Sequence, residues 1–363
     1  VEGVNYGAEI DRLTLIAINA VDVFVYDTSK DSDGGAWRTG ALAQASSWYN
    51  ETLNTSTRGS RREFPAVAVI VAEADKVTIY DGDDPSLPMW MVFNGASNVY
   101  RFTGYSTTTR PISSVFATNG IVVVGSLSNG FMTAVNFVSD GGQFYGTGSP
   151  NGFLLPSVSL RNTNLNNDFS QTNVIVSSTV NDVAMTVLPD APIDPATGLP
   201  VPTIAVATDG GVSVITDSGD VYDSASTLGF EDVAFDTENT LFYMRNSSIY
   251  RLGMALVGDF SSGDGFGDII ASNSVGDEDF DLLGTRQQVT TAFQDGVVAT
   301  GGFSTGTLIF GIHKVDKTNP QNVLSAGITS TYNTGWMNGD IKGAFLSDTD
   351  DTDLVGSGEL VTN

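Results

Sequence analysis

The stretch from Pro202 to Asp223 constrains the fold of this chain more than any other. Residues 204–208 are small or β-branched, and Asp209-Gly210-Gly211 can adopt the positive φ angles of a tight hairpin. In residues 212–216, one face carries Val212, Val214 and Thr216 and the other Ser213 and Ile215, as in a half-buried strand. A second turn and the short run Val221-Tyr222 follow. This order is most of a four-stranded antiparallel meander, so we expect an all-β fold built from such units.

An internal repeat extends this pattern along the chain. The segment 119–130 matches 295–306: each reads turn, four-residue strand, Gly, two residues, Ser, one residue, Gly. Between the two copies lie the unit 202–223 and a further one over 230–252. Matching hairpins at such separations are typical of a radial or linear array of β-sheets rather than of a single sandwich.

The count of units predicts the architecture. We expect about six units, with five to seven as the range. Five are centred near residues 70, 125, 205, 242 and 300, and a sixth is shared between the two chain ends. The strand-like runs 13–18 and 21–26 lack a first partner, and the run 341–346 is also unpaired. Joining the ends in one sheet would remove two exposed edges. The predicted fold is therefore a single β-propeller domain over 1–363, with four-stranded antiparallel blades, closed by N- and C-terminal strands in one sheet.

Four stretches read as loop insertions in this propeller. Residues 39–63 are irregular or weakly helical, and 140–180 are rich in Gly, Ser and Asn. Residues 189–202 carry five prolines, and 258–284 are rich in Gly and Asp. Loops on a rigid scaffold are where contacts to other molecules usually lie.

Charge and composition limit the possible functions. The chain has 42 acidic and 16 basic side chains, a formal net charge of −26. Such a surface repels phosphates and anionic membranes, so we expect no specific nucleic-acid recognition. No apolar run approaches about 20 residues, so we expect no membrane insertion. The chain has no Cys and one His, which removes thiolate metal sites and most nucleophile–base catalysis.

The acidic turn from Asp27 to Gly34 is the main candidate metal site. Four similar acidic turns lie at 81–84, 259–268, 277–281 and 348–353, and most of the five are expected to be solvated loops. Asp27, Asp31 and Asp33 alternate with other residues before a Gly, as oxygen ligands of Ca²⁺ do in a loop. The bidentate Glu of an EF-hand is absent, because position 40 is Gly. The alternatives are thus a Ca²⁺ ion, with no other cofactor expected, or a solvated turn.

Aromatic and basic residues give the candidate binding site. Trp37 and Trp48 have polar neighbours and are candidates to stack on sugar rings, whereas Trp90 lies in an apolar run and is expected in the core. A basic cluster near them could grip a partner's carboxylates or neutralise acids of this chain. His313 is expected as a polar tip at a strand end rather than as a catalytic group. The basic cluster consists of Arg38, Arg58, Arg61 and Arg62.

Two segments carry a resemblance to known families. Residues 21–93, which include Val-Phe-Val-Tyr-Asp-Thr-Ser-Lys-Asp-Ser-Asp-Gly-Gly-Ala-Trp-Arg and Arg-Gly-Ser-Arg-Arg-Glu-Phe-Pro, resemble a segment of structural proteins of marine tailed bacteriophages. Residues 204–215 are similar to repeats of β-propellers. The resemblance implies a tail part such as a propeller-bearing nozzle, a fibre or an adhesin, and it supplies no catalytic residues.

Two functions are therefore expected to compete. The first is a non-enzymatic viral structural protein located in the virion, a rigid propeller in a phage tail that forms a symmetric homo-oligomer, contacts other tail proteins and takes part in host attachment. A host surface glycan would be a further partner of this tail protein. The second is an extracellular propeller that binds or degrades polysaccharide. We favour the first, because one His, no Cys and no isolated carboxylate pair leave little for catalysis.

Overall fold

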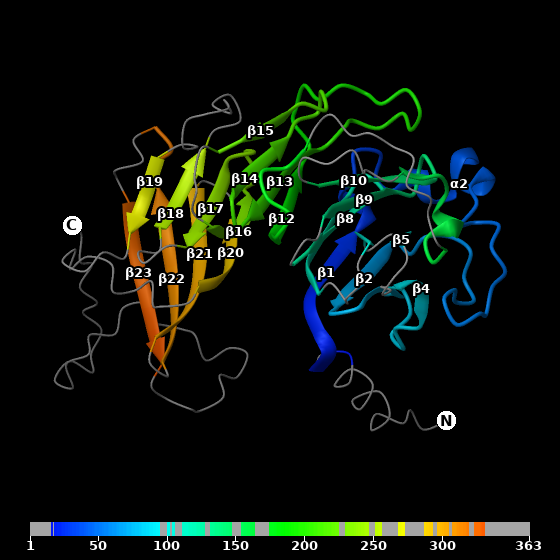
Figure 1. Cartoon of the computed structure of the whole chain (residues 1–363), viewed down its shortest axis with the longest axis horizontal. Coiled ribbons are helices and arrows are strands. Elements are labelled where there is room, and N and C mark those ends of the chain that lie inside the picture. Colours follow the sequence, from blue (N-terminus) through cyan, green and yellow to red (C-terminus); the bar gives the residue numbers. More distant parts are fainter. Residues whose placement is uncertain are drawn as a thin grey trace. The chain divides into compact units, whose positions relative to one another are not determined.

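The computed structural model describes part of the chain, in two compact units. The units are Val1–Val233 with Phe260–Gly265, and Ala234–Asp259 with Phe266–Asn363, and each is described here by itself (Figure 1). No helix in the described part is long and apolar enough to cross a membrane. The described residues are 16, 18–94, 100–101, 104–105, 111–127, 131–146, 154–163, 174–224, 229–246, 251–255, 268–272, 287–292, 296–304, 307–318 and 323–330.

The first unit contains three antiparallel sheets whose strands follow one another in chain order. A two-stranded hairpin, β5 (Tyr100–Arg101) and β6 (Gly104–Tyr105), lies between the first two sheets in the sequence. Sheet 1 has β1 (Ala20–Asp27), β2 (Val67–Glu73), β3 (Lys76–Asp81) and β4 (Met89–Asn94). Sheet 2 has β7 (Ile112–Thr118), β8 (Ile121–Ser126), β9 (Met132–Asn136), β10 (Gly141–Tyr145) and β11 (Leu154–Leu155). Sheet 3 has β12 (Val180–Thr186), β13 (Thr203–Thr208), β14 (Gly211–Ile215) and β15 (Val221–Asp223).

The second unit contains two further meander sheets, the first of which begins with a strand that starts in the first unit. Within the second unit, Lys317 forms ion pairs with Asp236 and Glu238, which ties the end of β22 to the turn after β16. Sheet 4 has β16 (Gly229–Phe235), β17 (Leu241–Asn246), β18 (Arg251–Ala255) and β19 (Asp268–Ser272). Sheet 5 has β20 (Gln287–Ala292), β21 (Val297–Ser304), β22 (Thr307–Val315) and β23 (Val323–Ser330).

The all-β class and the meander repeat are confirmed. Each of the five predicted centres falls in the second strand of a sheet: β2, β8, β13, β17 and β21. The two copies of the sequence repeat also pair with their preceding strands in the same way. Gly125 of β8 and Gly301 of β21 each lie opposite the residue that follows a register shift in that preceding strand. The sixth unit, expected at the chain ends, lies largely outside the described residues.

Several expectations about the first strands and the insertions were wrong. The run 21–26 does have a partner, since β1 pairs with β2. The long connection 28–66 separates the two strands, and the sequence gives no sign that it joins a pair. Ile16 and Ile18 are helical rather than extended. The insertion 140–180 contains β10 and β11, and 258–284 contains β19. The Gly-rich composition of these stretches concealed the strands in the sequence.

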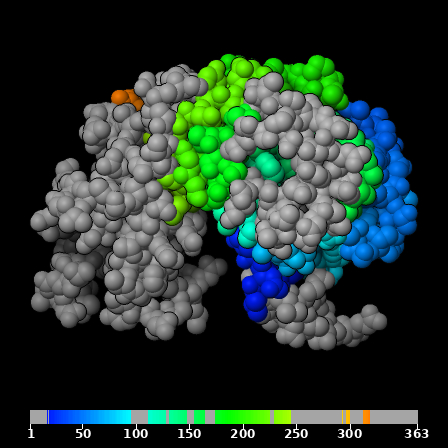
Figure 2. All heavy atoms as spheres, viewed as in Figure 1, coloured from blue at the N-terminus to red at the C-terminus, as the bar shows by residue number. Residues whose placement is uncertain are grey.

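The other two predicted insertions contain little regular structure. Residues 39–63 hold the end of a 3₁₀ turn, η2 (Ala36–Thr39), and one short helix, α2 (Ala41–Ala45). Residues 189–202 form a loop closed by an isolated bridge between Ile193 and Pro200. In the first unit, the blue atoms of the 28–66 connection make up a continuous stretch of the surface (Figure 2).

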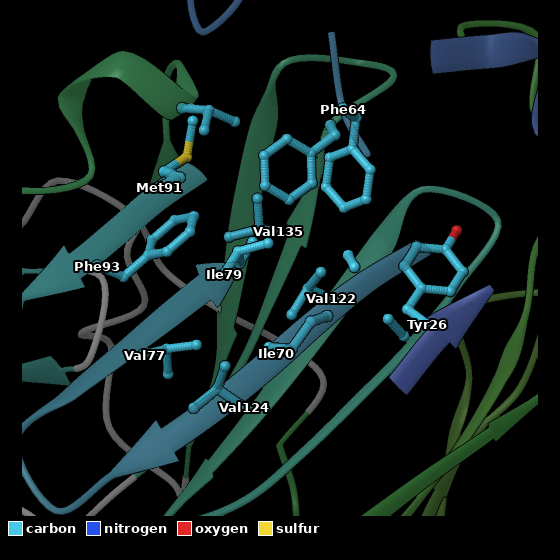
Figure 3. Packing of buried hydrophobic residues seen from close by; sticks show 14 of the residues in the cluster. Tyr26, Phe64, Ile70, Val77, Ile79, Met91, Phe93, Val122, Val124 and Val135 are labelled. Atoms are coloured by element: carbon cyan, nitrogen blue, oxygen red, sulfur yellow. The ribbon is translucent and has the colours of Figure 1, made fainter. Parts of the chain in front are cut away.

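The main core lies between sheets 1 and 2. Side chains of β2 and β3, such as Ile70, Val77 and Ile79, face Val122 and Val124 of β8 (Figure 3). These alternating positions are fully buried because both sheets turn their apolar faces inward. Phe64, Trp90 and Phe137 add an aromatic cluster at one end, with ring centroids 4.8–5.7 Å apart. The cluster brings the 28–66 connection into the core.

The outer edge of sheet 1 is covered by the same connection. The amide of Gly59 donates to the carbonyl of Trp90 at 2.9 Å, and the amide of Val92 donates to Thr57 at 3.0 Å. A Cβ at position 59 would lie 2.0 Å from the carbonyl oxygen of Met89, so only glycine allows this approach. The free hydrogen-bonding groups of an edge strand are thereby satisfied within the chain.

One kind of contact recurs between the first strands of neighbouring sheets. β1, β7 and β12 each have a register shift near the start, followed by Asp22, Ser114 and Asp182, respectively. The Asp22 carboxylate accepts from the amide of Val115 at 2.8 Å, and Asp182 accepts from the amide of Val233 at 3.0 Å. A side chain at this position thus reaches the main chain of the next sheet's first strand.

Candidate functional site

The acidic turn after β1 is held by its own side chains. Asp27 caps the 3₁₀ turn η1 (Thr28–Lys30) by accepting from the amide and hydroxyl of Ser29, at 3.1 and 2.7 Å. The Ser29 hydroxyl also lowers the pKa of Asp27. Asp33 accepts from the amides of Gly35 and Trp37 at 2.9 and 2.8 Å, which fixes the start of η2.

Asp31 has a different environment, because it is buried. Its carboxylate accepts from the Tyr26 hydroxyl, from the Trp37 indole N–H at 2.8 Å and from the Asn119 amide at 2.8 Å. Burial raises the pKa of Asp31 despite these three donors. The pKa of Tyr26 is also raised, first by burial and then by the neighbouring Asp31.

The turn therefore differs from the predicted Ca²⁺ loop, because its carboxylate oxygens point to hydrogen-bond donors of the chain itself. Each of Asp27, Asp31 and Asp33 binds donors of this chain. Within the described residues, no three or more His, Cys, Asp or Glu side chains form a group that could hold a metal ion. The Ca²⁺ site stays a prediction from the sequence alone.

Asn119 connects this turn to two other segments, and sequence reasoning did not find it. Its side chain accepts from the Ser32 amide at 2.9 Å and donates to the Pro200 carbonyl at 3.0 Å. Asn119 and Gly120 have φ angles of 48° and 72°, the left-handed pair that a tight hairpin requires. The Asn-Gly dipeptide was a visible signal for the turn, but not for these contacts to distant segments.

Trp37 and Trp48 are buried, so the expectation of exposed ring faces for sugar stacking was wrong. Their exposed fractions are 5% and 0%. Each indole N–H has an internal acceptor: Asp31 for Trp37, and the Phe137 carbonyl at 2.8 Å for Trp48. Trp48 also packs edge-on against Trp90 with ring centroids 5.7 Å apart. Polar neighbours in the sequence were misleading, because those neighbours cap turns around a buried ring.

Arg58 is buried as well, at 1% exposed. Its guanidinium lies 4.3 Å from the centre of the Trp90 ring and donates to the carbonyls of Trp90 and Arg62 at 2.9 and 2.8 Å. Burial lowers the pKa of Arg58 to about 10, which leaves it charged at neutral pH. The charge is balanced by Glu51, 3.5 Å away.

A second buried arginine, Arg161, shares this carboxylate. Its guanidinium pairs with Glu51 at 2.6 Å and donates to the carbonyls of Val92 and Thr57 at 2.9 and 3.0 Å. Burial also lowers the pKa of Arg161. The sequence did not suggest Arg161, because it lies alone in an irregular stretch far from the other arginines. One carboxylate between two buried guanidinium groups ties the 28–66 connection to sheets 1 and 2.

The remaining predicted arginines also bond within the chain. Arg38 donates to the Phe64 carbonyl at 2.8 Å, and Arg62 donates to the Tyr49 carbonyl at 2.9 Å. Arg61 pairs with Asp81 and Asp83 at 2.9 and 2.6 Å. The structure thus shows the internal role that the sequence left open as an alternative. A role in binding a partner's carboxylates stays a prediction.

His313 is placed differently from the prediction. It lies within β22 rather than at its end, and its side chain is fully buried. Burial lowers its pKa to about 4, so it is neutral at physiological pH.

Comparisons with known proteins yield distant structural similarity only. No family model matches the chain, and no curated protein matches it. Solved structures that are similar include a putative 6-phosphogluconolactonase from Bacteroides uniformis, at 10% identity and a TM-score of 0.40, over 76% of this chain and 69% of that one. The Dos1 propeller matches at 11% identity and a TM-score of 0.34, over 69% of this chain and 66% of that one. The structure of YCF48 bound to D1 peptide matches at 8% identity and a TM-score of 0.34, over 67% of this chain and 73% of that one.

Replacing the shared carboxylate should destabilise the fold. We expect Glu51→Gln to lower the free energy of unfolding by roughly 3 kcal/mol, because two buried guanidinium groups lose their counter-charge. Glu73→Gln is the control, since its partner Lys76 is 41% exposed and such a pair contributes at most about 1 kcal/mol. Urea unfolding of both variants measures the difference. Equal losses would show that Glu51 is no more than a surface partner.

The single histidine gives a direct pH test. In the folded protein its imidazole should titrate near pH 4, against about 6.5 in an unfolded chain. Unfolding then takes up a proton between these values, so the free energy of unfolding should fall by on the order of 3 kcal/mol as pH drops from about 6.5 to about 4.

NMR of the one imidazole measures the titration, and His313→Gln should lose this part of the pH dependence. An imidazole that titrates near 6.5 in the folded protein would contradict the burial of His313.

Proposed function

We propose that this chain is a non-enzymatic structural protein of a tailed-bacteriophage virion, a tail component of nozzle, fibre or adhesin type. The observation that carries the proposal is the position in the fold of the segment that resembles phage structural proteins. The resembling segment, 21–93, forms sheet 1 and the connection that packs into the core, and it includes the buried residues Trp37, Trp48 and Phe64. The resemblance therefore includes residues of a packed core, which a scaffold part of a tail requires.

We further propose that the sheets are blades of one β-propeller of about six blades, closed by strands from both chain ends. Consecutive meanders of four strands or more support this. A second support is the outward face of β1, where Val21, Val23 and Val25 are 50%, 48% and 59% exposed. Three valines in a row on one face of a first strand are suited to packing against another sheet.

Engineered disulfides test the closure, because the chain has no cysteine of its own. Val23→Cys is combined with a cysteine placed in turn at each position from 341 to 346. Side chains alternate along a strand and a disulfide spans only about 4.4–6.8 Å between Cα atoms, so we expect oxidation to link the position that faces Val23 and not its immediate neighbours. Ser218→Cys, in an exposed turn of sheet 3, serves as the control and should link to none. No link to Val23→Cys at any position would remove the proposed closure.

The proposed partners are other tail proteins and further copies of this chain in a symmetric assembly. The net charge of −26 favours protein contacts over nucleic acid or anionic membranes. The alternative function, a polysaccharide-binding or polysaccharide-degrading propeller, relied on stacking by Trp37 and Trp48. Neither ring can provide it, since both are buried.

Antibody labelling of virions tests the proposed function. An antibody raised against the purified chain should label one position on the tail of the phage that encodes it, and the chain should form defined multimers in sedimentation experiments. Label absent from virions, together with a strictly monomeric protein, would overturn the proposal. Binding or cleavage in a glycan panel that survives changes at Trp37 and Trp48 would favour a carbohydrate site elsewhere.

A further inference from the structure

The outward face of β1 is an exposed apolar surface. Side chains alternate along a strand, so Val21, Val23 and Val25 point the same way, and Ile18 lies just before them. These four residues are half of the eight large hydrophobic side chains that are exposed in the described part of the chain. A partner of the described residues would therefore gain more apolar contact here than at the scattered positions of the other four.

A recurring hydrogen bond shows how one sheet joins the next in the first unit. The polar residue after the register shift of one first strand accepts from the amide of a Val in the next first strand. That Val directly follows the polar residue of its own strand, so each first strand can offer one acceptor and one donor. The donor and acceptor pairs are Val115 and Asp22 at 2.8 Å, Val183 and the Ser114 hydroxyl at 3.4 Å, and Val233 and Asp182 at 3.0 Å.

The amide of Val23 has the donor position of this series in β1. It donates to Oδ1 of the adjacent Asp22 at 2.7 Å, while Oδ2 of Asp22 accepts from Val115. By the same rule, a sheet that covers β1 should bring a carboxylate or a hydroxyl to the Val23 amide. Sheet 5 cannot supply this acceptor, because the residue after the register shift of β20 is Val289.

The sequence after β23, which lies outside the described residues, contains one match to the pattern. There, Asp340 is the one Asp or Ser that is followed directly by a Val or Ile. It follows Val289 by about as many residues as Asp232 follows Asp182, which is the spacing of two successive first strands. It also directly precedes the run 341–346, which the sequence predicts to be a strand.

We propose that residues 340–346 form the first strand of a sixth sheet that covers β1, and that the Asp340 carboxylate accepts a hydrogen bond from the Val23 amide. This inference rests on the proposed closed ring and names the bond that closes it. A carboxylate bound to a main-chain amide is a charge-assisted hydrogen bond, and its geometry fixes the register of the new strand. The valine face of β1 then loses its contact with water, which favours closure.

Single thiols in the full chain, which has no cysteine of its own, test the cover. Val25→Cys places a thiol on the valine face, and Ser218→Cys places one in an exposed turn. We expect a maleimide to react with the first about tenfold or more slowly than with the second. Adding Asp340→Ala should remove about tenfold of this protection, the contribution of one hydrogen bond to a charged group. Asp350→Ala makes the same change of charge and should leave the protection intact.

A second readout is independent of the thiols. Hydrogen exchange of the Val23 amide, followed by NMR, should be about tenfold faster in Asp340→Ala than in the unmodified chain. Asp340→Asn keeps a carbonyl oxygen as acceptor, so it should restore much of the protection. If Asp340→Ala changes neither rate, or changes both no more than Asp350→Ala does, the proposed bond is refuted.

The occupant and the larger proposals are tested separately. Protection of the thiol at position 25 should not depend on protein concentration, and protection that is lost on dilution would show that a second copy covers β1 and would refute the inference. A disulfide between Val23→Cys and the run 341–346, together with no effect of Asp340→Ala, would refute the bond and leave the closed ring standing. Labelling of virions measures the proposed function and does not depend on either result.

Discussion

The first unit depends on a contact that joins the first strand of each sheet to the first strand of the next. A polar side chain placed just after a register shift accepts a hydrogen bond from a main-chain amide of the neighbouring sheet, as Asp22 and Asp182 do. Apolar packing between sheets is not directional, so it does not by itself set how one sheet lies on the next. A hydrogen bond between a fixed side chain and a fixed amide does, since it tolerates little displacement. The register shift brings that side chain to the required face, and Ser114 takes the same position in sheet 2.

The sequence predicted the repeating unit well and its limits poorly. Alternation and Gly-containing turns depend on neighbouring residues, so the second strands of all five described sheets could be located from them. The first strands were harder, because the partner of β1 lies beyond a long connection and the partner of β12 beyond a Pro-rich loop. The signal that was missed is short: Val-Asp-Val at 21–23, Asn-Asp-Val at 181–183 and Glu-Asp-Val at 231–233. An Asp next to a Val within a strand resembles an ordinary alternation of polar and apolar residues until its inter-sheet contact is known.

Three of the predicted binding residues have internal roles in the structure. Trp37, Trp48 and Arg58 lie within one packed region, as their closeness in the sequence suggested. Their burial could not be predicted, because it depends on acceptors supplied by remote segments, such as the Phe137 carbonyl, and on Arg161. Local polarity predicts exposure only where no distant part of the chain provides a partner.

The covered edge of sheet 1 has a consequence for assembly. Residues 57–59 already occupy the main-chain groups of β4 that a strand from another molecule would need. Neighbouring molecules therefore cannot add a strand to this sheet next to β4, and any contact on that flank has to be made by side chains. Such contacts can be exchanged one residue at a time, so this flank can change its neighbour during evolution while the sheet beneath it stays as it is.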